Sequence, residues 1–317
     1  MKKTIIFDPA LSSMNMGDHI ISEAVREQID PIIKDSFIID ISTHLPISRL
    51  YTRHIKDSNF KFVAGSNLLR GKMDRIFRQW DIRLDQKDLV SDSILVGAGW
   101  WQYGDEPNFY TKILYNNILS KDYLHSVRDE FTKEKLNSIG INNVLNTSCA
   151  TMWKLTKEHN SKTPQNKAKN VIFTVTDYKQ DKLSDEKMIN CLIDNYENVY
   201  FWIQGFKDED YYQTLNIDRN KINIIGPSLA KYNEVLINGD VDFVGTRLHA
   251  GIRALQNNVR TLIIGVDNRA IEKQKNFNIN VLERKNIDNL EDIINSKMSN
   301  EILIPEKEIK LWKDQFQ

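Results

Sequence analysis

The sequence predicts an α/β protein built from two doubly wound, Rossmann-like domains that face each other across a cleft. Its length of 317 residues exceeds what a single hydrophobic core usually holds. Short apolar segments rich in β-branched residues alternate with helical periodicity, which is typical of parallel sheets covered by helices. A polar, proline-containing stretch at 157–167 interrupts this alternation and is interpreted as a linker. We therefore expect domains at 1–157 and 168–300, with an amphipathic segment at 301–317 that packs back across the boundary.

Predicted strands and helices alternate in each domain. Apolar runs in the first domain predict strands at 4–8, 37–41, 60–64, 94–97, 125–127 and 143–145, with helices at 19–29, 109–119 and 129–138. In the second domain they predict strands at 171–175, 199–204, 222–225, 241–244 and 261–264, with helices between them. Gly140 is a predicted helix stop and Ser228 a predicted helix cap. Ligands of such sheets bind beyond the carboxyl ends of the strands, so we look for site residues there.

Composition excludes several classes of function. The chain has 43 basic and 43 acidic residues, so no overall positive field points to nucleic acid. No apolar run approaches the roughly 20 residues that cross a bilayer, and no signal-peptide core is present, so we expect a cytoplasmic protein. The cysteines and histidines show no metal-ligand spacing. A dinucleotide fingerprint and a P-loop are lacking too, which disfavours those cofactors, and no pattern indicates an oligomeric state.

The most informative segment is 241–255, where a strand ends at Gly245 and helical spacing begins after Thr246. Arg247 and His249 lie at this junction. Backbone N–H groups and the helix dipole favour an anion there. A guanidinium and a titratable imidazole make it a candidate place to hold a phosphate or carboxylate and to move a proton beside it. The alternative is a solvated Arg247 and a His249 that caps or packs.

The loop after the first strand contains Asn15, Gly17 and Asp18. Asn15 and Asp18 can bond sugar hydroxyls, and Gly17 makes a turn between them. Asp18 is alternatively an ordinary acidic residue in the first turn of a helix.

Two further loops at strand ends bear glycines, which let a backbone approach a ligand closely. The first loop includes Asn67, and the second includes Gly99, Trp100 and Trp101. The two indole rings offer flat faces that suit a sugar ring. Core packing is the alternative for them, and we expect one of the two to point inward.

Two more arginines follow strands. Arg128 is either a second anion anchor or the partner of Asp129 or Glu130, and Arg269 presents a third cation. Three guanidiniums from separate strand ends would suit a multiply charged ligand, since arginine binds carboxylate and phosphate in bidentate fashion.

In this order, the motifs resemble those of the polysaccharide pyruvyl transferase family over nearly the whole length. The resemblance rests on Asn15-Met16-Gly17-Asp18, Gly65-Ser66-Asn67-Leu68, Gly97-Ala98-Gly99, Val127-Arg128-Asp129 and Gly245-Thr246-Arg247-Leu248-His249-Ala250. The last motif is the most specific. The resemblance implies a GT-B-like fold and an enzyme that moves the enolpyruvyl moiety of phosphoenolpyruvate onto two hydroxyls of a sugar, which yields a pyruvate ketal and phosphate.

The resemblance also implies roles for individual residues. His249 is the expected general acid, because an ordinary histidine pKa of ~6.5 lies near cellular pH. Arg247 and Arg128 complete the expected catalytic group by neutralising the donor. The expected donor-binding residues are Ser228, Leu248, Asn268 and Arg269. The expected acceptor-binding residues are Asn15, Gly17, Asp18, Asn67, Gly99, Trp100 and Trp101.

The expected partners are phosphoenolpyruvate, as a substrate rather than a cofactor, and a sugar of a surface or capsular polysaccharide or its precursor. A lipid-linked precursor would add peripheral contact with a membrane, and no metal is required. Asn268-Arg269 departs from the lysine common in the family, and Cys149 lies in a variant segment, where it either lines the cleft or is buried. Two alternatives stay open: a GT-B glycosyltransferase that uses a nucleotide sugar, and a non-catalytic homologue that binds sugars or anions.

Overall fold

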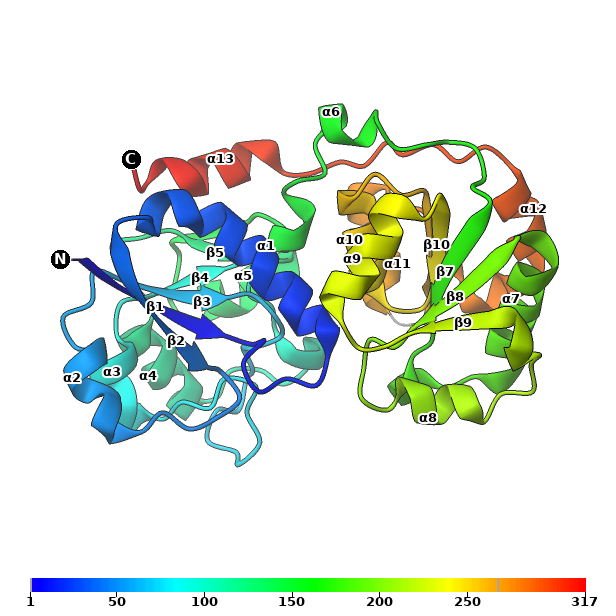
Figure 1. The fold of residues 1–317 in the computed structure, drawn as a ribbon. Coiled ribbons are helices and arrows are strands. Elements are labelled where there is room, and N and C mark those ends of the chain that lie inside the picture. Colours follow the sequence, from blue (N-terminus) through cyan, green and yellow to red (C-terminus); the bar gives the residue numbers. More distant parts are fainter. Residues whose placement is uncertain (1, 267) are drawn as a thin grey trace. The chain divides into compact units, whose positions relative to one another are not determined.

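A computed structural model describes residues 2–266 and 268–317 of the chain. Contacts within it define two compact units, and each unit is described by itself (Figure 1). Unit 1 comprises Met1–Ser13, Ile21–Trp153 and Pro305–Gln317. Unit 2 comprises Met14–Ile20 and Lys154–Ile304. The C-terminal segment therefore belongs to unit 1, whereas the end of the loop after the first strand, from Met14 on, belongs to unit 2.

Unit 1 contains a parallel sheet in the order β2-β1-β3-β4 and a parallel pair, β5-β6. The strands are β1 (Lys2–Asp8), β2 (Ser36–Ser42), β3 (Phe60–Ala64), β4 (Ser93–Val96), β5 (His125–Val127) and β6 (Val144–Asn146). The helices are α1 (Met16–Ile33), whose residues up to Ile20 belong to unit 2, α2 (Thr52–Ile55), α3 (Lys87–Val90), α4 (Phe109–Ile118), α5 (Glu130–Ser138) and α13 (Glu306–Asp314). A bridge between Ala98 and Val127 links β5 to the end of β4.

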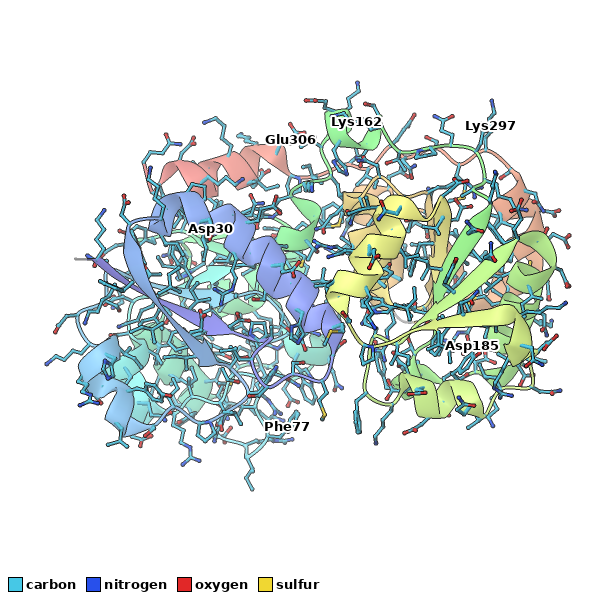
Figure 2. All side chains as sticks on the ribbon, viewed as in Figure 1. Asp30, Phe77, Lys162, Asp185, Lys297 and Glu306 are labelled. Atoms are coloured by element: carbon cyan, nitrogen blue, oxygen red, sulfur yellow. The ribbon has the colours of Figure 1, made fainter. Side chains whose placement is uncertain are left out.

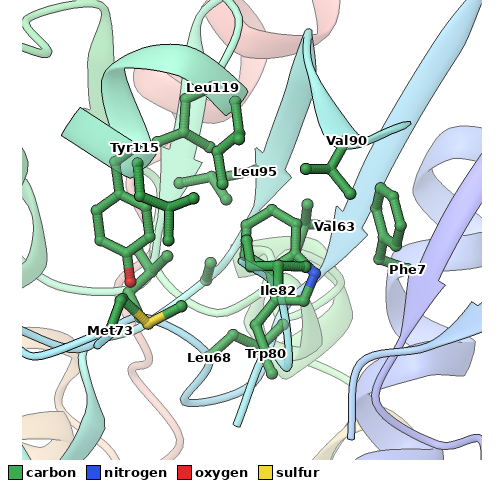
Figure 3. Close-up of a cluster of buried hydrophobic side chains, with 14 of the residues drawn as sticks. Phe7, Val63, Leu68, Met73, Trp80, Ile82, Val90, Leu95, Tyr115 and Leu119 are labelled. Atoms are coloured by element: carbon green, nitrogen blue, oxygen red, sulfur yellow. The ribbon is translucent and has the colours of Figure 1, made fainter. Parts of the chain in front are cut away.

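The main core of unit 1 lies between this sheet and α4. Phe7, Val63 and Leu95 come from β1, β3 and β4 and pack with Trp80 and Tyr115 (Figure 3). Each fully buried side chain of this size contributes about 1.5–3 kcal/mol relative to an exposed one. The core therefore fixes the strands whose carboxyl ends carry the glycine-bearing loops.

The second face of this sheet is completed by the C-terminal segment. Phe316 follows α13, and its ring centroid lies 5.7 Å from that of Phe62 and 5.8 Å from that of Phe60. Trp312 packs against Trp153 at 5.4 Å between ring centroids. Residues at opposite ends of the sequence thus share one apolar layer.

Unit 2 contains a parallel sheet in the order β12-β11-β10-β7-β8-β9. The strands are β7 (Asn170–Thr174), β8 (Asn198–Trp202), β9 (Ile222–Ile225), β10 (Val241–Gly245), β11 (Thr261–Gly265) and β12 (Val281–Glu283). The helices are α6 (Lys157–Asn160), α7 (Lys182–Asn195), α8 (Asp208–Gln213), α9 (Leu229–Asn238), α10 (Leu248–Gln256), α11 (Asn268–Phe277) and α12 (Leu290–Asn295).

Helices cover both faces of the unit 2 sheet. Ile172 of β7 packs in the cluster that includes residues of α9 and α10, whereas its neighbour Phe173 packs with residues of α7, α8 and α12 (Figure 1). Successive strand residues point to opposite faces, so both sides of the strand are apolar. This arrangement confirms the predicted doubly wound architecture.

Two details differ from the prediction. Strand β12, which follows a polar helix, was not predicted. The predicted linker contains the one-turn helix α6, in which Thr156 accepts a hydrogen bond from the His159 backbone N–H at 3.2 Å. Asn160 at the end of α6 is buried, so this stretch is packed rather than extended.

His125 of β5 is a buried structural residue of unit 1. Its Nδ1 accepts a hydrogen bond from the Leu95 backbone N–H at 3.2 Å, and its Nε2 lies 2.9 Å from the Ser120 carbonyl oxygen. This pattern requires a neutral ring with its proton on Nε2. Burial lowers the pKa of His125 to about 4.

We expect acidification to destabilise the protein through His125. Between pH ~6.5 and about 4 the unfolded chain binds a proton on this ring and the folded chain does not, so the free energy of unfolding falls by up to about 3 kcal/mol as the pH drops through this window. Urea unfolding of the parent and of His125→Gln at pH 7 and pH 4.5 measures this effect. The parent should lose more stability than the variant, and equal losses would contradict the assignment.

Candidate functional site

The strand order of unit 2 determines where its ligand crevice lies. The chain enters the sheet at β7, adds β8 and β9 on one side, and later adds β10, β11 and β12 on the other. The carboxyl ends of β7 and β10 therefore form the topological switch point, where doubly wound sheets bind ligands. Asp177 follows β7 and Arg247 follows β10, so both lie at this point.

The junction after β10 is held by hydroxyl groups of the neighbouring β7 segment. A Cβ atom on Gly245 would lie 2.4 Å from Thr174 Oγ1, so the close approach of the two strands requires glycine. Thr246 Oγ1 bonds Thr176 Oγ1 at 2.8 Å, and the Arg247 N–H donates to Thr174 Oγ1 at 3.2 Å. Helix α10 then begins directly after Arg247. The predicted strand-to-helix junction is confirmed.

The guanidinium of Arg247 is buried and compensated by two carboxylates. Nε donates to Asp208 Oδ2 at 3.1 Å and Nη2 donates to Asp208 Oδ1, which makes a bidentate pair. Nη2 also donates to Asp177 Oδ1 at 2.8 Å. Burial would lower the pKa of Arg247, but Asp208, Tyr178 and Asp177 outweigh it and raise the pKa above its ordinary value. Arg247 is thus paired with two carboxylates, whereas the sequence suggests a guanidinium that is available to bind an anion.

Asp208 fixes the position of Arg247. Its buried carboxylate also accepts hydrogen bonds from the Gly205 N–H at 2.7 Å and the Asp177 N–H at 3.3 Å. A Cβ atom on Gly205 would lie 2.5 Å from Arg247 Nη2, so the turn before α8 needs glycine to admit the guanidinium. With backbone and side-chain donors on both oxygens, this carboxylate has no freedom to leave Arg247.

The other predicted donor residues with described side chains follow strands β10 and β9 of unit 2. Leu248 and His249 are the first two residues of α10, and both are half-buried. Ser228 caps α9 by accepting a hydrogen bond from the Lys231 N–H at 3.3 Å, as predicted.

The other two arginine predictions are left open by the structure. The side chains of Asn268 and Arg269 lie outside the described residues. Arg128 belongs to unit 1. Convergence of Arg128, Arg247 and Arg269 therefore stays a prediction.

Asn15, Gly17 and Asp18 lie with unit 2 instead of the first domain. Asn15 forms an antiparallel bridge with Gly205, and its Oδ1 accepts hydrogen bonds from the Gly17 N–H and from Gln204 Nε2, both at 3.1 Å. These contacts hold Asn15 against the turn between β8 and α8. The predicted acceptor loop therefore supports the turn that carries Gly205 and precedes Asp208.

The glycine-bearing motifs of unit 1 meet at the carboxyl ends of β3, β4 and β5. Arg128 Nη1 donates to Asn67 Oδ1, and Nε donates to Asp129 at 2.9 Å. Burial would raise the pKa of Asp129, but Arg128 and Thr132 outweigh it and lower the pKa. A Cβ atom on Gly99 would lie 2.1 Å from Arg128 Nε, so this glycine makes room for Arg128, and its role in acceptor binding stays a prediction. Arg128 does pair with Asp129, and its role as a second anion anchor stays a prediction.

Trp100 and Trp101 occupy different environments. Trp100 is 0% exposed, with its ring centroid 6.3 Å from that of Tyr115, so its predicted role as an acceptor platform is wrong. Trp101 is half-buried, with the Arg70 guanidinium 4.9 Å from its ring centroid. Phe77, at 5.9 Å from Trp101, projects from the surface of unit 1 (Figure 2). Trp101 therefore remains a candidate sugar platform.

The two tryptophans provide a matched pair of variants. Trp100→Ala should lower the free energy of unfolding by about 3–5 kcal/mol, because it leaves a cavity in the core. Trp101→Ala should cost about 1 kcal/mol or less and instead raise the KM for the acceptor. Denaturant unfolding and acceptor titration measure the two effects. Equal losses of stability, or an unchanged acceptor KM in Trp101→Ala, would contradict this division.

Cys149 is buried, and its Sγ accepts a hydrogen bond from Thr151 Oγ1 at 3.2 Å. The buried alternative is therefore correct for this residue.

The likeness of the chain to known proteins identifies its family. The family model described as polysaccharide pyruvyl transferase matches residues 15–268, most of the chain. The chain belongs to the polysaccharide pyruvyl transferase family. The matched range contains the motifs of both units, and it ends at the first residue of α11. No curated protein matches this pyruvyl transferase family member.

Solved structures show the fold of this family member. The Methanocaldococcus jannaschii UDP-GlcNAc 2-epimerase in complex with UDP-GlcNAc and UDP has a TM-score of 0.52 and 14% identity, with 98% of each chain covered. S. aureus MnaA with UDP has a TM-score of 0.49 and 14% identity, with 98% of this chain and 94% of that chain covered. The E. coli heptosyltransferase WaaC with ADP-2-deoxy-2-fluoro heptose has a TM-score of 0.42 and 11% identity, with 83% of this chain and 88% of that chain covered. The likeness to the Methanocaldococcus jannaschii epimerase shows a GT-B-like fold, as predicted.

Residues 2–266 and 268–317 of this family member lack two features. Across these residues, no helix combines the length and the apolar character needed to span a bilayer. The same residues contain no group of three or more His, Cys, Asp or Glu side chains placed to hold a metal ion.

Sequence reasoning missed Asp177, Gln204 and Asp208, which surround Arg247 or its supporting turn. Each follows one of the two strands β7 and β8 within six residues, so the rule that sites lie beyond strand ends could have found them. None of them belongs to the motifs that carry the family resemblance.

Proposed function

We propose that this family member transfers the enolpyruvyl group of phosphoenolpyruvate to sugar hydroxyls of a surface polysaccharide or its precursor. The products are a pyruvate ketal and phosphate. The observation that carries the proposal is the Arg247–His249 junction: a guanidinium fixed by Asp208 and a half-buried imidazole, both at the switch point of a GT-B-like unit.

The donor chemistry suits this junction. Phosphoenolpyruvate carries a carboxylate and a phosphate at close quarters, and the N-terminus of the nine-residue α10 adds backbone N–H donors to the Arg247 cation. In the proposed reaction His249 protonates the methylene carbon, and a first sugar hydroxyl adds to the neighbouring carbon. The bond from that carbon to the phosphate oxygen then breaks, and a second hydroxyl closes the ketal. Positive charge beside the departing phosphate lowers the barrier. This scheme uses no cofactor.

The acceptor is proposed to contact unit 1 through Trp101 and the Asn67–Arg128 pair. Support comes from the exposed edge of Trp101 beside Phe77 and from the convergence of three strand-end loops at Arg128. An aromatic face and an amide are the groups that bind a sugar ring and its hydroxyls.

A release assay tests the proposal. The purified protein is incubated with phosphoenolpyruvate and a panel of sugars, nucleotide sugars and lipid-linked sugars, and inorganic phosphate is measured. We expect release that requires both phosphoenolpyruvate and one class of acceptor. Nucleotide release from a nucleotide sugar, with no use of phosphoenolpyruvate, would instead identify a glycosyltransferase. Binding of either ligand without turnover would identify a non-catalytic homologue.

A further inference from the structure

Arg247 has two carboxylate partners that differ in freedom. The Asp208 side chain is 0% exposed and accepts backbone N–H groups as well as the guanidinium. The Asp177 side chain is 23% exposed, and it lies in the short 3-10 turn 177–179 that follows β7. Asp208 is therefore a fixed partner, whereas the Asp177 carboxylate can leave by a change of its side-chain rotamer while its backbone N–H stays bonded to Asp208.

The two partners also occupy different edges of the guanidinium. Asp208 takes the edge formed by Nε and Nη2. Asp177 also bonds Nη2, which has two N–H groups. Because Asp208 uses the one on the Nε edge, the other belongs to the second edge, formed by Nη1 and Nη2, which a carboxylate or phosphate can bind in bidentate fashion. An anionic ligand on this second edge needs a hydrogen bond from the same Nη2 N–H group that now donates to Asp177.

Charge reinforces this competition. With Asp177 in place, one guanidinium faces two carboxylates. This group of three side chains has a net negative charge, so it repels an anionic ligand. If Asp177 leaves, Arg247 and Asp208 form a neutral pair with a free bidentate edge, and the backbone N–H groups of α10 remain nearby.

We propose that Asp177 is a placeholder: its carboxylate occupies the second edge of Arg247 until the carboxylate or phosphate of the donor displaces it. The placeholder satisfies the buried guanidinium while the site is empty, and it lowers the apparent affinity for the donor, because only the open fraction of molecules can bind. This inference rests on the proposed function for the identity of the donor, but the competition itself concerns any small anion.

The test uses Asp177→Asn, which keeps the shape of the side chain and removes its charge. We expect the KM for phosphoenolpyruvate and the dissociation constant for inorganic phosphate, measured by calorimetry, each to fall about fivefold, the gain from removing a weak competing ion pair. Asp210→Asn is the matched control, because Asp210 is exposed on the same helix as Asp208 and the variant makes the same change in net charge. The control should leave both constants unchanged.

The outcomes separate this inference from the proposed function. Tighter phosphate binding by Asp177→Asn alone supports the placeholder even if the parent protein does not turn over phosphoenolpyruvate, a result that would refute only the proposed function. Unchanged or weaker phosphate binding by Asp177→Asn overturns the placeholder, since a merely structural carboxylate would give that result. An equal gain in Asp210→Asn also overturns it, because net charge would then explain the effect.

Discussion

Replacing His249 with alanine should lower phosphoenolpyruvate-dependent phosphate release by about 10²–10⁴-fold, the usual contribution of a positioned general acid. The imidazole is half-buried at the start of α10, next to the fixed Arg247, so its removal takes away the proton donor but little packing. The free energy of unfolding should change by less than about 1 kcal/mol. Steady-state phosphate release and denaturant unfolding measure the two quantities.

His159→Gln is the control for this variant. The His159 Nε2 lies 2.9 Å from the carbonyl oxygen of Leu255, near the other end of α10, so this histidine supports the helix without approaching its N-terminus. Turnover of the control should stay close to that of the parent. Near-normal turnover in His249→Ala would refute the acid role, and equal losses in both variants would point to a general effect on the helix.

The second large effect is expected from Asp208→Asn. Asp208→Asn breaks a buried bidentate ion pair and leaves Arg247 with only the partly exposed Asp177 carboxylate. Loss of one partner of a buried pair typically costs about 3–5 kcal/mol of unfolding free energy, and the remaining Asp177 places the expected loss toward the lower end. Because Asp208 also holds the orientation of Arg247, kcat should fall further than the loss of folded protein explains. Unfolding curves give the stability, and kcat per folded molecule gives the effect on the site.

Unit 2 offers a matched control for this change. Asp242 and Arg260 form another buried ion pair, with both side chains 2% exposed, but Asp242 lies near the start of β10 and Arg260 precedes β11. Asp242→Asn should therefore cost similar stability while leaving kcat per folded molecule unchanged. If the two variants lower kcat alike, Asp208 acts only through folding, and its positioning role is wrong.

The fold class and most strands could be predicted from the sequence. The period of the apolar residues indicates which side chains are buried, and glycine indicates where the backbone turns. Strands such as β3, β5 and β9 have the predicted bounds, and Gly140 ends its helix with a φ of 91°. Strand β12, at the edge of the unit 2 sheet, was missed although the equally short β5 and β6 were predicted, so length alone does not explain the miss. Unlike β5, it is followed directly by the charged residues Arg284 and Lys285 and by no motif that marks a strand end.

The site was predictable in position but not in pairing. The rule for strand ends found Arg247 and Arg128, yet only the fold shows that each meets a carboxylate. Asp129 is adjacent to Arg128 in sequence and could be named as its partner, whereas Asp208 lies 39 residues from Arg247 and depends on the order of β8, β7 and β10. Trp100 and Trp101 are identical in type and adjacent, so only packing distinguishes the buried ring from the accessible one.

The C-terminal segment has a consequence for biosynthesis. Pro305–Gln317 belongs to unit 1, although the ribosome makes it only after all of unit 2. Until then, Phe60, Phe62 and Trp153 lack the aromatic partners that cover them in the finished protein. The second unit can fold before the first is complete, and until the C-terminal segment is made unit 1 exposes apolar surface of the kind that promotes aggregation of folding intermediates.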